Sequence, residues 1–535
     1  MNITKLESQL GPWVIRHRWI ILAFSLLLTL AAASGARFLT FENDSRIFFS
    51  KDNPQLQAFD AMERTYAKSD NVMFVITDPS GDIFNNETLS AIEWLTTESW
   101  MTPFSSRVDS ITNFQYTYAE EDEMVVEDMV SDAFQLNLDQ ISLIKQRVLK
   151  EPLLLNRLVA PESETGAGVT AVNITIQKPE QVGNEVTQVA KFVREMGTRF
   201  QQRYPNLQLH IGGGLMFNNA FMDASMDDMS SLVPLMYLVL IVVMFWLLRS
   251  FTGTLSTFLI IGFSVAVAMG TAGWLGMALS PPSANSPTII LTIAIAHCIH
   301  ILSTFSIHMR QGESKNEAIS ESLRINVEPV VLTSITTAIG FLSMNAANAP
   351  PFHTLGNIVA IGSIASMLFS LLTLPALISL LPVRQPKQEK GHYHQFMEAF
   401  GDFVVRKTRI LTYGSIALVV ASISGIAAIT LDDNFVLYFD DDYEIRQYAD
   451  YTMDNLTGLD LIEYSLNAGG SGDINEPDYL QKIEEFANWY RQQPKVAHVS
   501  VLTDIVKRLN KNMHGDDEQY FKIPEERELA AQYLL

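Results

Sequence analysis

Two unlike kinds of sequence alternate along this chain, long apolar blocks and strongly polar stretches. Seven apolar blocks are long enough to form helices of about 20 residues, the length that crosses a lipid bilayer. They cover residues 19–39, 232–248, 255–279, 288–307, 330–344, 358–381 and 410–431. Five of them crowd together with short connectors, which is atypical of helices buried in a soluble core. The pattern predicts a polytopic α-helical membrane protein.

Basic residues gather in the connectors on one side of these blocks, and their placement predicts the topology. They are Lys5, Arg16, Arg18, Arg249, Arg310, Lys315, Arg324, Arg384, Lys387, Lys390, Arg406, Lys407 and Arg409. The connectors on the other side, residues 280–287 and 345–354, contain neither Lys nor Arg. Because positively charged connectors stay in the cytoplasm, we expect a cytoplasmic N-terminus, with residues 40–227 and 432–535 on the outer side of the membrane.

These boundaries divide the chain into seven parts. They are a cytoplasmic amphipathic N-terminus (1–18), a first span (19–39), an extracytoplasmic α/β domain (40–227), a five-span membrane block (228–382), a cytoplasmic linker (383–409), a seventh span (410–431) and a partial second extracytoplasmic domain (432–535). The first span also resembles a cleavable signal peptide, because Arg16, His17 and Arg18 precede an apolar stretch that ends in small residues. The internal repeat described next favours its retention.

An internal repeat relates the two ends of the chain. At a spacing of 390 residues, Trp13-Val14-Ile15-Arg16 aligns with Phe403-Val404-Val405-Arg406, and Ser34-Gly35 aligns with Ser424-Gly425. With one inserted residue, Gly81-Asp82-Ile83 matches Gly472-Asp473-Ile474. Many secondary transporters consist of two similar halves. We therefore expect a two-fold internal repeat whose second half is truncated in this chain.

The polar stretch between the first two spans has the pattern of an α/β domain. Apolar alternation predicts strands at residues 71–77, 168–177 and 206–212, and the repeat predicts another at 461–466. Amphipathic periodicity predicts helices at 86–100, 138–149 and 185–204. Helices alternating with strands predict a split βαβ, ferredoxin-like sandwich. The acidic run 120–128 is expected to be a solvated loop, with a cation-attracting site as the alternative.

Composition excludes several kinds of chemistry. Residues 40–227 contain 14 Lys and Arg against 28 Asp and Glu, and the whole chain has a net charge of −22. That acidity argues against a nucleic-acid partner, because phosphate binding needs clustered basic residues. The single cysteine, Cys298, excludes an internal disulfide and any CxxC motif. We expect no enzyme, cofactor or metal, since neither a nucleophile–base pair nor a phosphate-cradling Gly-Lys-Ser/Thr loop is visible.

Two histidines stand near the middle of the fourth apolar block, which contains no Asp, Glu, Lys or Arg. His297 and His300 are spaced i and i+3, so they share a helix face. Ionisable residues at that depth are functional candidates by default, and imidazole titrates near neutral pH. We predict that His297 takes up and releases a proton. The alternatives are hydrogen bonding to Ser and Thr of neighbouring helices and a metal site with Cys298, which lies about 100° round the helix from His297.

The fifth apolar block carries hydroxyl side chains at helical spacing. Thr333, Thr336 and Thr337 form a polar stripe that can face His297 and hold water, and they join the two histidines as proton-relay candidates. Gly340 is expected to permit close helix contact. The alternative for the threonines is hydrogen bonding to their own backbone carbonyls one turn back, and the two roles are compatible.

These residues carry a resemblance to a known family. The layout of one span, an outer domain, five spans and a repeat resembles the resistance–nodulation–division (RND) superfamily, and more narrowly the MMPL-type and hydrophobe/amphiphile exporters, whose span block is similar to a sterol-sensing domain. The sharpest matches are Ala296-His297-Cys298-Ile299-His300, Arg310-Gln311-Gly312, Glu317-Ala318-Ile319, Leu332-Thr333-Ser334-Ile335-Thr336-Thr337, Gly340-Phe341, Pro351-Phe352, Leu355-Gly356 and Pro375-Ala376. In the family, the position of His297 is commonly a proton-relaying aspartate.

The resemblance implies proton-motive-force-driven export of a lipid or other amphiphile, with an imidazole in place of the family's carboxylate. It also implies a bacterial inner (plasma) membrane, with the large outer domains in the periplasm. The partners it implies are membrane lipids, a hydrophobic or amphiphilic cargo, protons, and a second copy or a periplasmic partner protein. Two alternatives stay open. One is a lipid-sensing or scaffolding membrane protein that transports nothing, and the other is a protein-export accessory of the SecDF kind.

Overall fold

The computed structural model describes residues 3–42, 45–66, 70–121, 123–160, 168–177, 185–383, 392–430 and 434–534. Backbone contacts divide the chain into two units. One, the membrane unit, comprises Met1–Leu56 and Phe221–Asp433, and the other, the outer unit, comprises Gln57–Ala220 and Asn434–Leu535. Each unit is described by itself. The basic residues Arg384, Lys387 and Lys390 lie outside the described residues.

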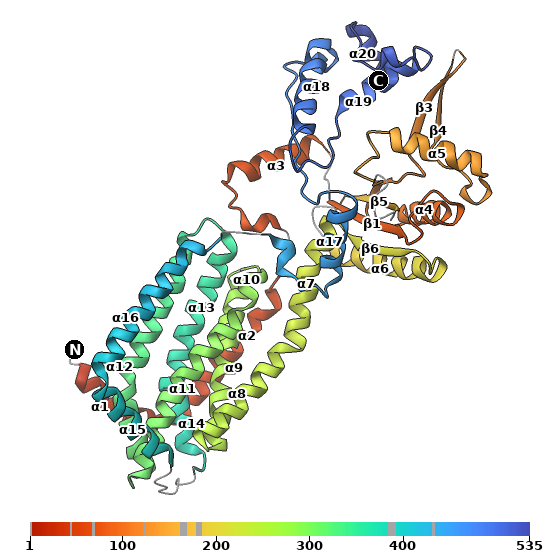
Figure 1. The fold of residues 1–535 in the computed structure, drawn as a ribbon. Helices are drawn as coiled ribbons and strands as arrows, with labels where there is room; N and C mark the ends of the chain where they lie inside the picture. Colours follow the sequence, from red (N-terminus) through yellow and green to blue (C-terminus); the bar gives the residue numbers. More distant parts are fainter. Residues whose placement is uncertain are drawn as a thin grey trace. The chain divides into compact units, whose positions relative to one another are not determined.

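The membrane unit consists of helices (Figure 1). They are α1 (Ile3–Arg16), α2 (Arg18–Ala33), α8 (Leu232–Leu248), α9 (Phe251–Trp274), α10 (Pro281–Ala284), α11 (Ser286–Arg310), α12 (Lys315–Leu342), α13 (Pro350–Leu368), α14 (Leu374–Leu380), α15 (His392–Arg406) and α16 (Thr408–Ser424), with α7 (Gly214–Ser230) leading into α8. Seven of the described helical segments are long and apolar enough to cross a bilayer. The prediction of seven spans is therefore confirmed. A π-helical turn, η5 (Phe369–Thr373), joins α13 to α14.

Helix α12 is longer than the apolar block that predicted it. It begins directly after Ser314, whose side chain accepts a hydrogen bond from the backbone N–H of Glu317, while the Glu317 side chain bonds back to the Ser314 N–H. This reciprocal capping box satisfies two of the free donors at the helix start. The polar first turns were not part of the predicted span because they contain Lys315 and Glu317, and hydropathy detects only the apolar part of a helix.

Small residues allow the first span to lie directly against α9. A Cβ added at Gly270 would overlap the carbonyl oxygen of Ala32, and one added at Gly273 would overlap that of Gly35. Close backbone approach of this kind is typical of membrane helix pairs. The same role was predicted for Gly340, but the described residues place no helix in close contact with it. Gly340 is exposed, and an added Cβ would meet no atom within 4 Å.

The outer unit contains a four-stranded antiparallel sheet in the order β2-β5-β1-β6. The strands are β1 (Asp70–Asp78), β2 (Ser105–Asp109), β5 (Gly168–Ile176) and β6 (Gln208–Gly212), and the helices are α3 (Pro54–Thr65), α4 (Asn86–Ser99), α5 (Leu138–Lys150), α6 (Glu185–Arg203), α17 (Glu444–Asn455), α18 (Pro477–Arg491), α19 (Leu502–Asn512) and α20 (Arg527–Tyr533). Helix α4 connects β1 to β2, and α6 connects β5 to β6. The strands and helices predicted between residues 71 and 212 are confirmed.

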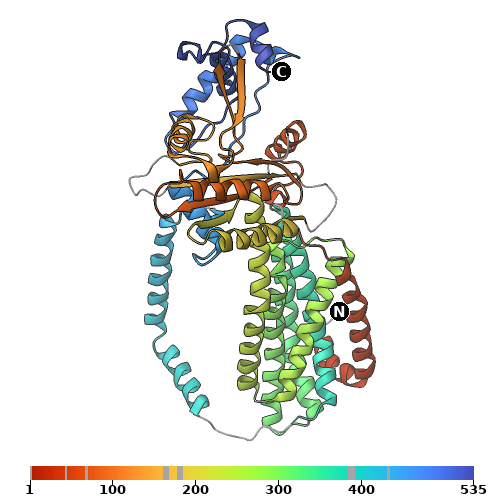
Figure 2. The same ribbon diagram turned by 90° about the vertical axis from the view of Figure 1, so that its right-hand side faces the viewer.

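The acidic run 120–128 is not the solvated loop that was predicted. Its described residues form a hairpin of β3 (Gln115–Glu120) and β4 (Glu123–Asp128), paired in register from Gln115–Asp128 to Glu120–Glu123. Figure 2 shows the hairpin beside the C-terminal helices, where the Thr117 hydroxyl donates to Asn512 Oδ1 at 2.7 Å. The prediction failed because the short apolar run Met124-Val125-Val126 was outweighed by the density of charge around it.

The strand predicted at residues 461–466 does not form. This segment is extended but unpaired, and Leu461, Ile462 and Tyr464 expose more than half of their surface. In the first half, β1 is held by β5 on one side and β6 on the other. No segment of the described residues supplies either partner to 461–466. A strand cannot be stable without a neighbour to satisfy its backbone hydrogen bonds.

Asp78 ends β1 and organises the turn into α4. Its carboxylate accepts hydrogen bonds from the Thr88 hydroxyl at 2.7 Å, the Asn85 amide at 2.8 Å and the Ser80 N–H at 2.8 Å. Burial disfavours the charged form of Asp78, but these hydrogen bonds outweigh burial and lower the pKa of its carboxyl below the ordinary value. The Asp78 carboxylate therefore holds the start of α4 against the sheet.

Replacing Asp78 with Asn is expected to destabilise the outer unit by about 1–3 kcal/mol at pH 7, because charge-assisted hydrogen bonds are lost. A lowered folded pKa adds stability above the unfolded pKa of about 4, and this contribution is lost as pH falls through the folded value. The wild-type protein should lose that increment on acidification and D78N should not. Unfolding followed by tryptophan fluorescence at pH 7 and pH 3 measures both effects, and parallel pH dependence in the two proteins would contradict the assignment.

Candidate functional site in the membrane helices

His297 lies where three helices of the membrane unit meet. It projects from α11 and exposes only 4% of its surface. Its Nδ1 lies 3.1 Å from the hydroxyl oxygen of Ser366 on α13. Its Nε2 lies 3.3 Å from the hydroxyl oxygen of Ser334 and 3.5 Å from that of Thr333, both on α12. One imidazole therefore bridges α12 and α13, with a hydroxyl group on each side of the ring.

The surrounding hydrogen bonds assign the tautomer of His297. The Ser334 hydroxyl donates to the Val330 carbonyl at 2.8 Å, and the Thr333 hydroxyl donates to the Pro329 carbonyl at 2.9 Å. Both oxygens are left as acceptors, so Nε2 carries the hydrogen and donates to them. Nδ1 then accepts from the Ser366 hydroxyl. This arrangement satisfies a neutral imidazole, and a proton added at Nδ1 needs only a rotation of the Ser366 hydroxyl to find an acceptor.

A second hydroxyl group ties the two flanking helices together. Ser363 lies one turn before Ser366 on α13, and its hydroxyl donates to the Ser334 carbonyl at 3.2 Å. Ser334, Ser363 and Ser366 are all fully buried. The hydroxyl groups around His297 therefore sit in packed helix contacts, where their positions are held.

The other histidine predicted for this site lies elsewhere. His300 is exposed among the described residues, whereas His297 is buried. They share a broad face of α11, but only His297 lies between α12 and α13. The structure therefore brings His297 into the helix contact and leaves His300 at its edge.

The threonines predicted to line the site are only partly there. The Thr333 hydroxyl oxygen lies 3.5 Å from His297 Nε2, and the same hydroxyl also donates to the Pro329 carbonyl one turn back. Thr336 is exposed, and its hydroxyl donates to the carbonyls of Leu332 and Thr333. Thr337 is half-buried and has no contact with His297 among those described. The predicted polar stripe therefore lies on the helix that contacts His297, but Thr336 and Thr337 do not reach the imidazole.

Sequence reasoning missed Ser334 and Ser366, the closest hydroxyl groups to His297. A signal for the second was present, because Ser363, Ser366 and Ser370 recur in the sixth span at i, i+3 and i+7, one helix face. Ser334 stands in the same apolar block, but its neighbours Thr333 and Thr336 fitted the spacing of a helix face toward His297 equally well. Only the rotation of α12 against α11, which depends on all the surrounding helices, distinguishes them.

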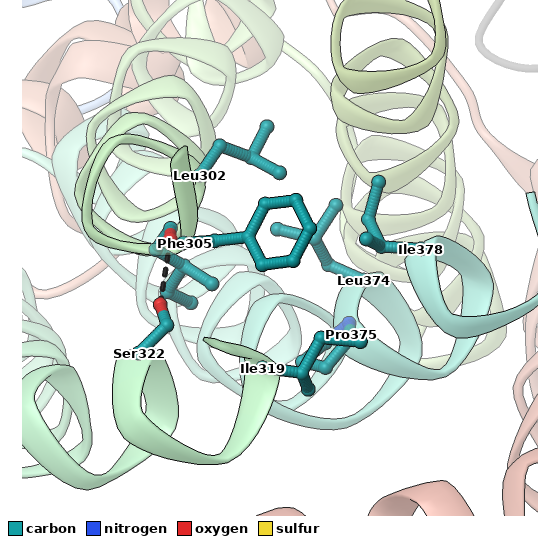
Figure 3. A pocket seen from close by; sticks show the side chains of 8 residues that line it. Leu302, Phe305, Ile319, Ser322, Leu374, Pro375 and Ile378 are labelled. Atoms are coloured by element: carbon teal, nitrogen blue, oxygen red, sulfur yellow. Dashed lines mark hydrogen bonds between the residues drawn. The ribbon is translucent and has the colours of Figure 1, made fainter. Parts of the chain in front are cut away.

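An apolar pocket lies one to two turns along α11 from His297 (Figure 3). It is lined by Ile301, Leu302 and Phe305 of α11, Ile319 and Ser322 of α12, and Leu374, Pro375 and Ile378 of α14. The dashed line in Figure 3 is the 2.6 Å hydrogen bond from the Ser322 hydroxyl to the Ile301 carbonyl. Because the Ser322 hydroxyl is hydrogen-bonded to the backbone, the surface of the pocket is essentially hydrocarbon.

Within the part of the chain that the structure describes, no three His, Cys, Asp or Glu side chains are grouped so that they could hold a metal ion. The buried site at His297 therefore offers proton chemistry and hydrogen bonding from an imidazole and hydroxyl groups.

Seven membrane-crossing helices with an ionisable side chain buried among them define a polytopic membrane protein with an intramembrane polar site. The family model of the MMPL family matches residues 48–411. The chain belongs to this family, and the resemblance to RND-type transporters is confirmed. MMPL proteins are transporters.

Three named proteins are similar to parts of this chain. The sulfolipid-1 exporter MmpL8 of Mycobacterium tuberculosis is 27% identical over 257 residues, which cover 45% of this chain and 23% of MmpL8. A putative membrane protein of Methanocaldococcus jannaschii, MJ1562, is 31% identical over 109 residues, covering 20% of this chain and 28% of that protein. The nickel-cobalt-cadmium resistance protein NccA of Alcaligenes xylosoxydans is 22% identical over 189 residues, covering 35% and 17%. The chain thus matches about a quarter of the length of MmpL8.

Proposed function

We propose that this chain exports a lipid or other amphiphile out of the inner membrane and that the proton gradient drives it. The observation that carries the proposal is His297, an imidazole buried between hydroxyl groups of two helices in a member of the MMPL family. A buried ionisable group in a membrane helix is costly, so its presence favours a functional role. MmpL8, which is named a sulfolipid exporter, supports a lipid-like cargo.

The geometry of the ring suggests how a proton would act on the helices. A proton added at Nδ1 of His297 turns the Ser366 hydroxyl from donor to acceptor, and it makes both ring nitrogens donors. A charged imidazolium in a low-dielectric contact is unstable unless water or an opposite charge reaches it. Protonation would therefore loosen α11 from α12 and α13, and deprotonation would restore their packing. Alternation between two such packings is the basis of transport by repeat-containing proteins.

The proposal includes the orientation of the protein and its internal repeat. A cytoplasmic N-terminus and periplasmic outer domains follow from the basic connectors. The repeat is supported by element positions, because α3 (Pro54–Thr65) and α17 (Glu444–Asn455) have equal lengths 390 residues apart. The ferredoxin-like assignment is supported by the strand order β2-β5-β1-β6 with α4 and α6 as the two crossovers. A second copy or a periplasmic protein would be the partner that carries the cargo onward.

The test is transport by the purified full-length protein in proteoliposomes. A fluorescent phosphatidylethanolamine serves as the amphiphile. Fluorescence quenching measures its transfer from the membrane to an external acceptor, and an imposed pH gradient supplies the driving force. We expect transfer that depends on the gradient and stops with a protonophore. Transfer that is equal with and without the gradient would refute proton-driven export.

A second function is favoured by one observation. The neutral tautomer of His297 is fully hydrogen-bonded, which a purely structural contact between helices would also show. On that basis the chain would be a lipid-sensing or scaffolding protein that binds an amphiphile without moving it. The proteoliposome measurement distinguishes the two, since a sensor binds the fluorescent lipid and releases none to the acceptor.

A further inference from the structure

Three polar residues follow one stripe of α11 toward the end of the helix that joins α12. They are His297, Thr304 and His308, separated by 7 and 4 residues. At 100° per residue, these three positions lie within about 40° of one another. Each of them contacts α12 or the loop that leads to it. The stripe therefore runs along the α11–α12 contact for about 16 Å.

Helix α12 supplies a matching polar group in the middle of this stripe. The Asn326 side chain donates to the Thr304 hydroxyl oxygen at 3.0 Å, and it is 6% exposed. The Thr304 hydroxyl donates in turn to the His300 carbonyl at 3.0 Å. Four residues before Asn326, Ser322 bonds the Ile301 carbonyl. A buried amide in a membrane helix contact is costly unless its partners are polar. Asn326 and Thr304 therefore form an intermediate polar position between His297 and the loop.

The far end of the stripe holds a carboxylate with a spare oxygen. His308 Nδ1 lies 2.8 Å from Glu313 Oε1 in the loop between α11 and α12. Glu313 Oε2 is buried and has no hydrogen-bond partner among the described residues. A buried carboxylate oxygen without a donor is a place where a proton or a water molecule is stabilised. The pair is thus a candidate proton acceptor at the edge of the membrane unit.

Other charged groups near this pair have their own positions and partners. Arg310 precedes the loop on α11, and Glu317 follows it on α12, where it caps that helix. The Lys315 ammonium donates to the carbonyls of Ser379 and Leu381 at 2.8 and 2.7 Å. Lys315 therefore holds the end of α14, and it is not the partner of the spare Glu313 oxygen.

We propose that the polar line of Thr304, Asn326, His308 and Glu313 is the path by which protons leave His297 toward the cytoplasm. The proposal rests on the proposed function. An imidazolium that has gained a proton at Nδ1 loses the proton at Nε2, on the side facing α12. The Nε2–H bond breaks, the proton passes to water held at Thr304 and Asn326, and an O–H bond forms at the Glu313 carboxylate. The ring is left neutral as the other tautomer, and Glu313 then releases the proton to bulk water.

In this path Thr304 and Asn326 are positioning residues, because they hold water and do not themselves take up the proton. A purely structural polar contact would make a different prediction. It would allow N326L to weaken helix packing, but it would give Glu313 no effect on proton transfer. The two roles are therefore separable at Glu313, which lies in a loop and tolerates an isosteric change.

The experiment measures proton transfer across proteoliposomes that contain the full-length protein and pyranine, under an imposed pH gradient. The variants are E313Q, E313D and N326L, with E321Q as the matched control because Glu321 is a half-buried carboxylate on α12 paired with Arg324. We expect E313Q and N326L to lower the rate at least about tenfold, E313D to restore at least half of it, and E321Q to stay within about twofold. N326S replaces N326L if N326L does not elute at the same volume as the wild-type protein.

The outcomes separate this path from the function on which it rests. If H297A abolishes proton transfer while folded E313Q and N326L keep wild-type rates, the path is overturned and the proposed function stands. If H297A itself transfers protons at the wild-type rate, the proposed function fails and the path fails with it. If E313Q and E313D are equally slow, a carboxylate is not the acceptor, and the assignment of Glu313 is refuted.

Discussion

Replacing His297 with Ala is expected to lower gradient-driven transfer of the lipid probe by at least about a hundredfold. The imidazole is the single titratable group between α11, α12 and α13 in the contacts described, and Ala can neither bind a proton nor bond Ser334 and Ser366. Binding of the fluorescent lipid should persist, because an apolar cargo is recognised by apolar surface rather than by this ring. Transfer and binding are measured in the same proteoliposomes.

The matched control is H353A. His353 lies near the start of α13, and its Nε2 bonds the Ala347 carbonyl at 2.7 Å, so it is also a histidine with a hydrogen bond in the membrane unit. His353 lies 13 residues before Ser366 on α13, which is more than three helical turns, so it is well away from His297. H353A should transfer the probe at close to the wild-type rate. Equal loss in H353A and H297A would mean that removal of any histidine damages the protein and that His297 has no special role.

The second large effect is expected on stability. Replacing Gly270 with Leu should destabilise the membrane unit by about 3 kcal/mol or more, because the new side chain would collide with the backbone of Ala32 and Ala33 on the first span. Backbone atoms cannot rotate away as a side chain can, so the helices must separate. We expect the thermal midpoint in detergent to fall by roughly 5–10 °C.

G340L provides the comparison for this change. Both glycines lie inside membrane helices, so the gain in helix propensity is the same at each position. An added Cβ at Gly340 meets no atom within 4 Å, whereas one at Gly270 meets the carbonyl oxygen of Ala32. The thermal midpoint of G340L should stay within a few degrees of wild type. A midpoint lowered equally in both variants would show that the α2–α9 contact does not depend on Gly270.

Much of the architecture was predictable because hydropathy and strand alternation are properties of single segments. The seven membrane helices were each located by their apolar part, and the outer-domain helices α4, α5 and α6 were located within a few residues, since each buries a face that its own sequence displays. The predicted strand at 461–466 failed for the opposite reason. Its sequence resembles β1, but a strand also needs partners, and these come from distant parts of a chain.

The site was predictable in part for the same physical reason. His297 could be identified alone, because an ionisable residue in an uncharged apolar block is visible in one segment. Its partners could not, because Ser334 and Ser366 belong to helices whose rotation is set by contacts such as Ser363 with the Ser334 carbonyl. The polar line to Glu313 was missed for a related reason, since Thr304 and Asn326 are ordinary polar residues until α11 and α12 are placed together.

The central claim is that His297 changes its protonation state during transport. It is tested most directly by solid-state NMR of the ¹⁵N-histidine-labelled protein in bilayers, with the His297 resonances assigned by comparison with H297Q. The account predicts that, while the gradient drives transfer of the lipid probe, part of the His297 signal moves to the imidazolium position and returns when a protonophore stops transfer. A His297 signal that stays neutral throughout active transfer would contradict the account.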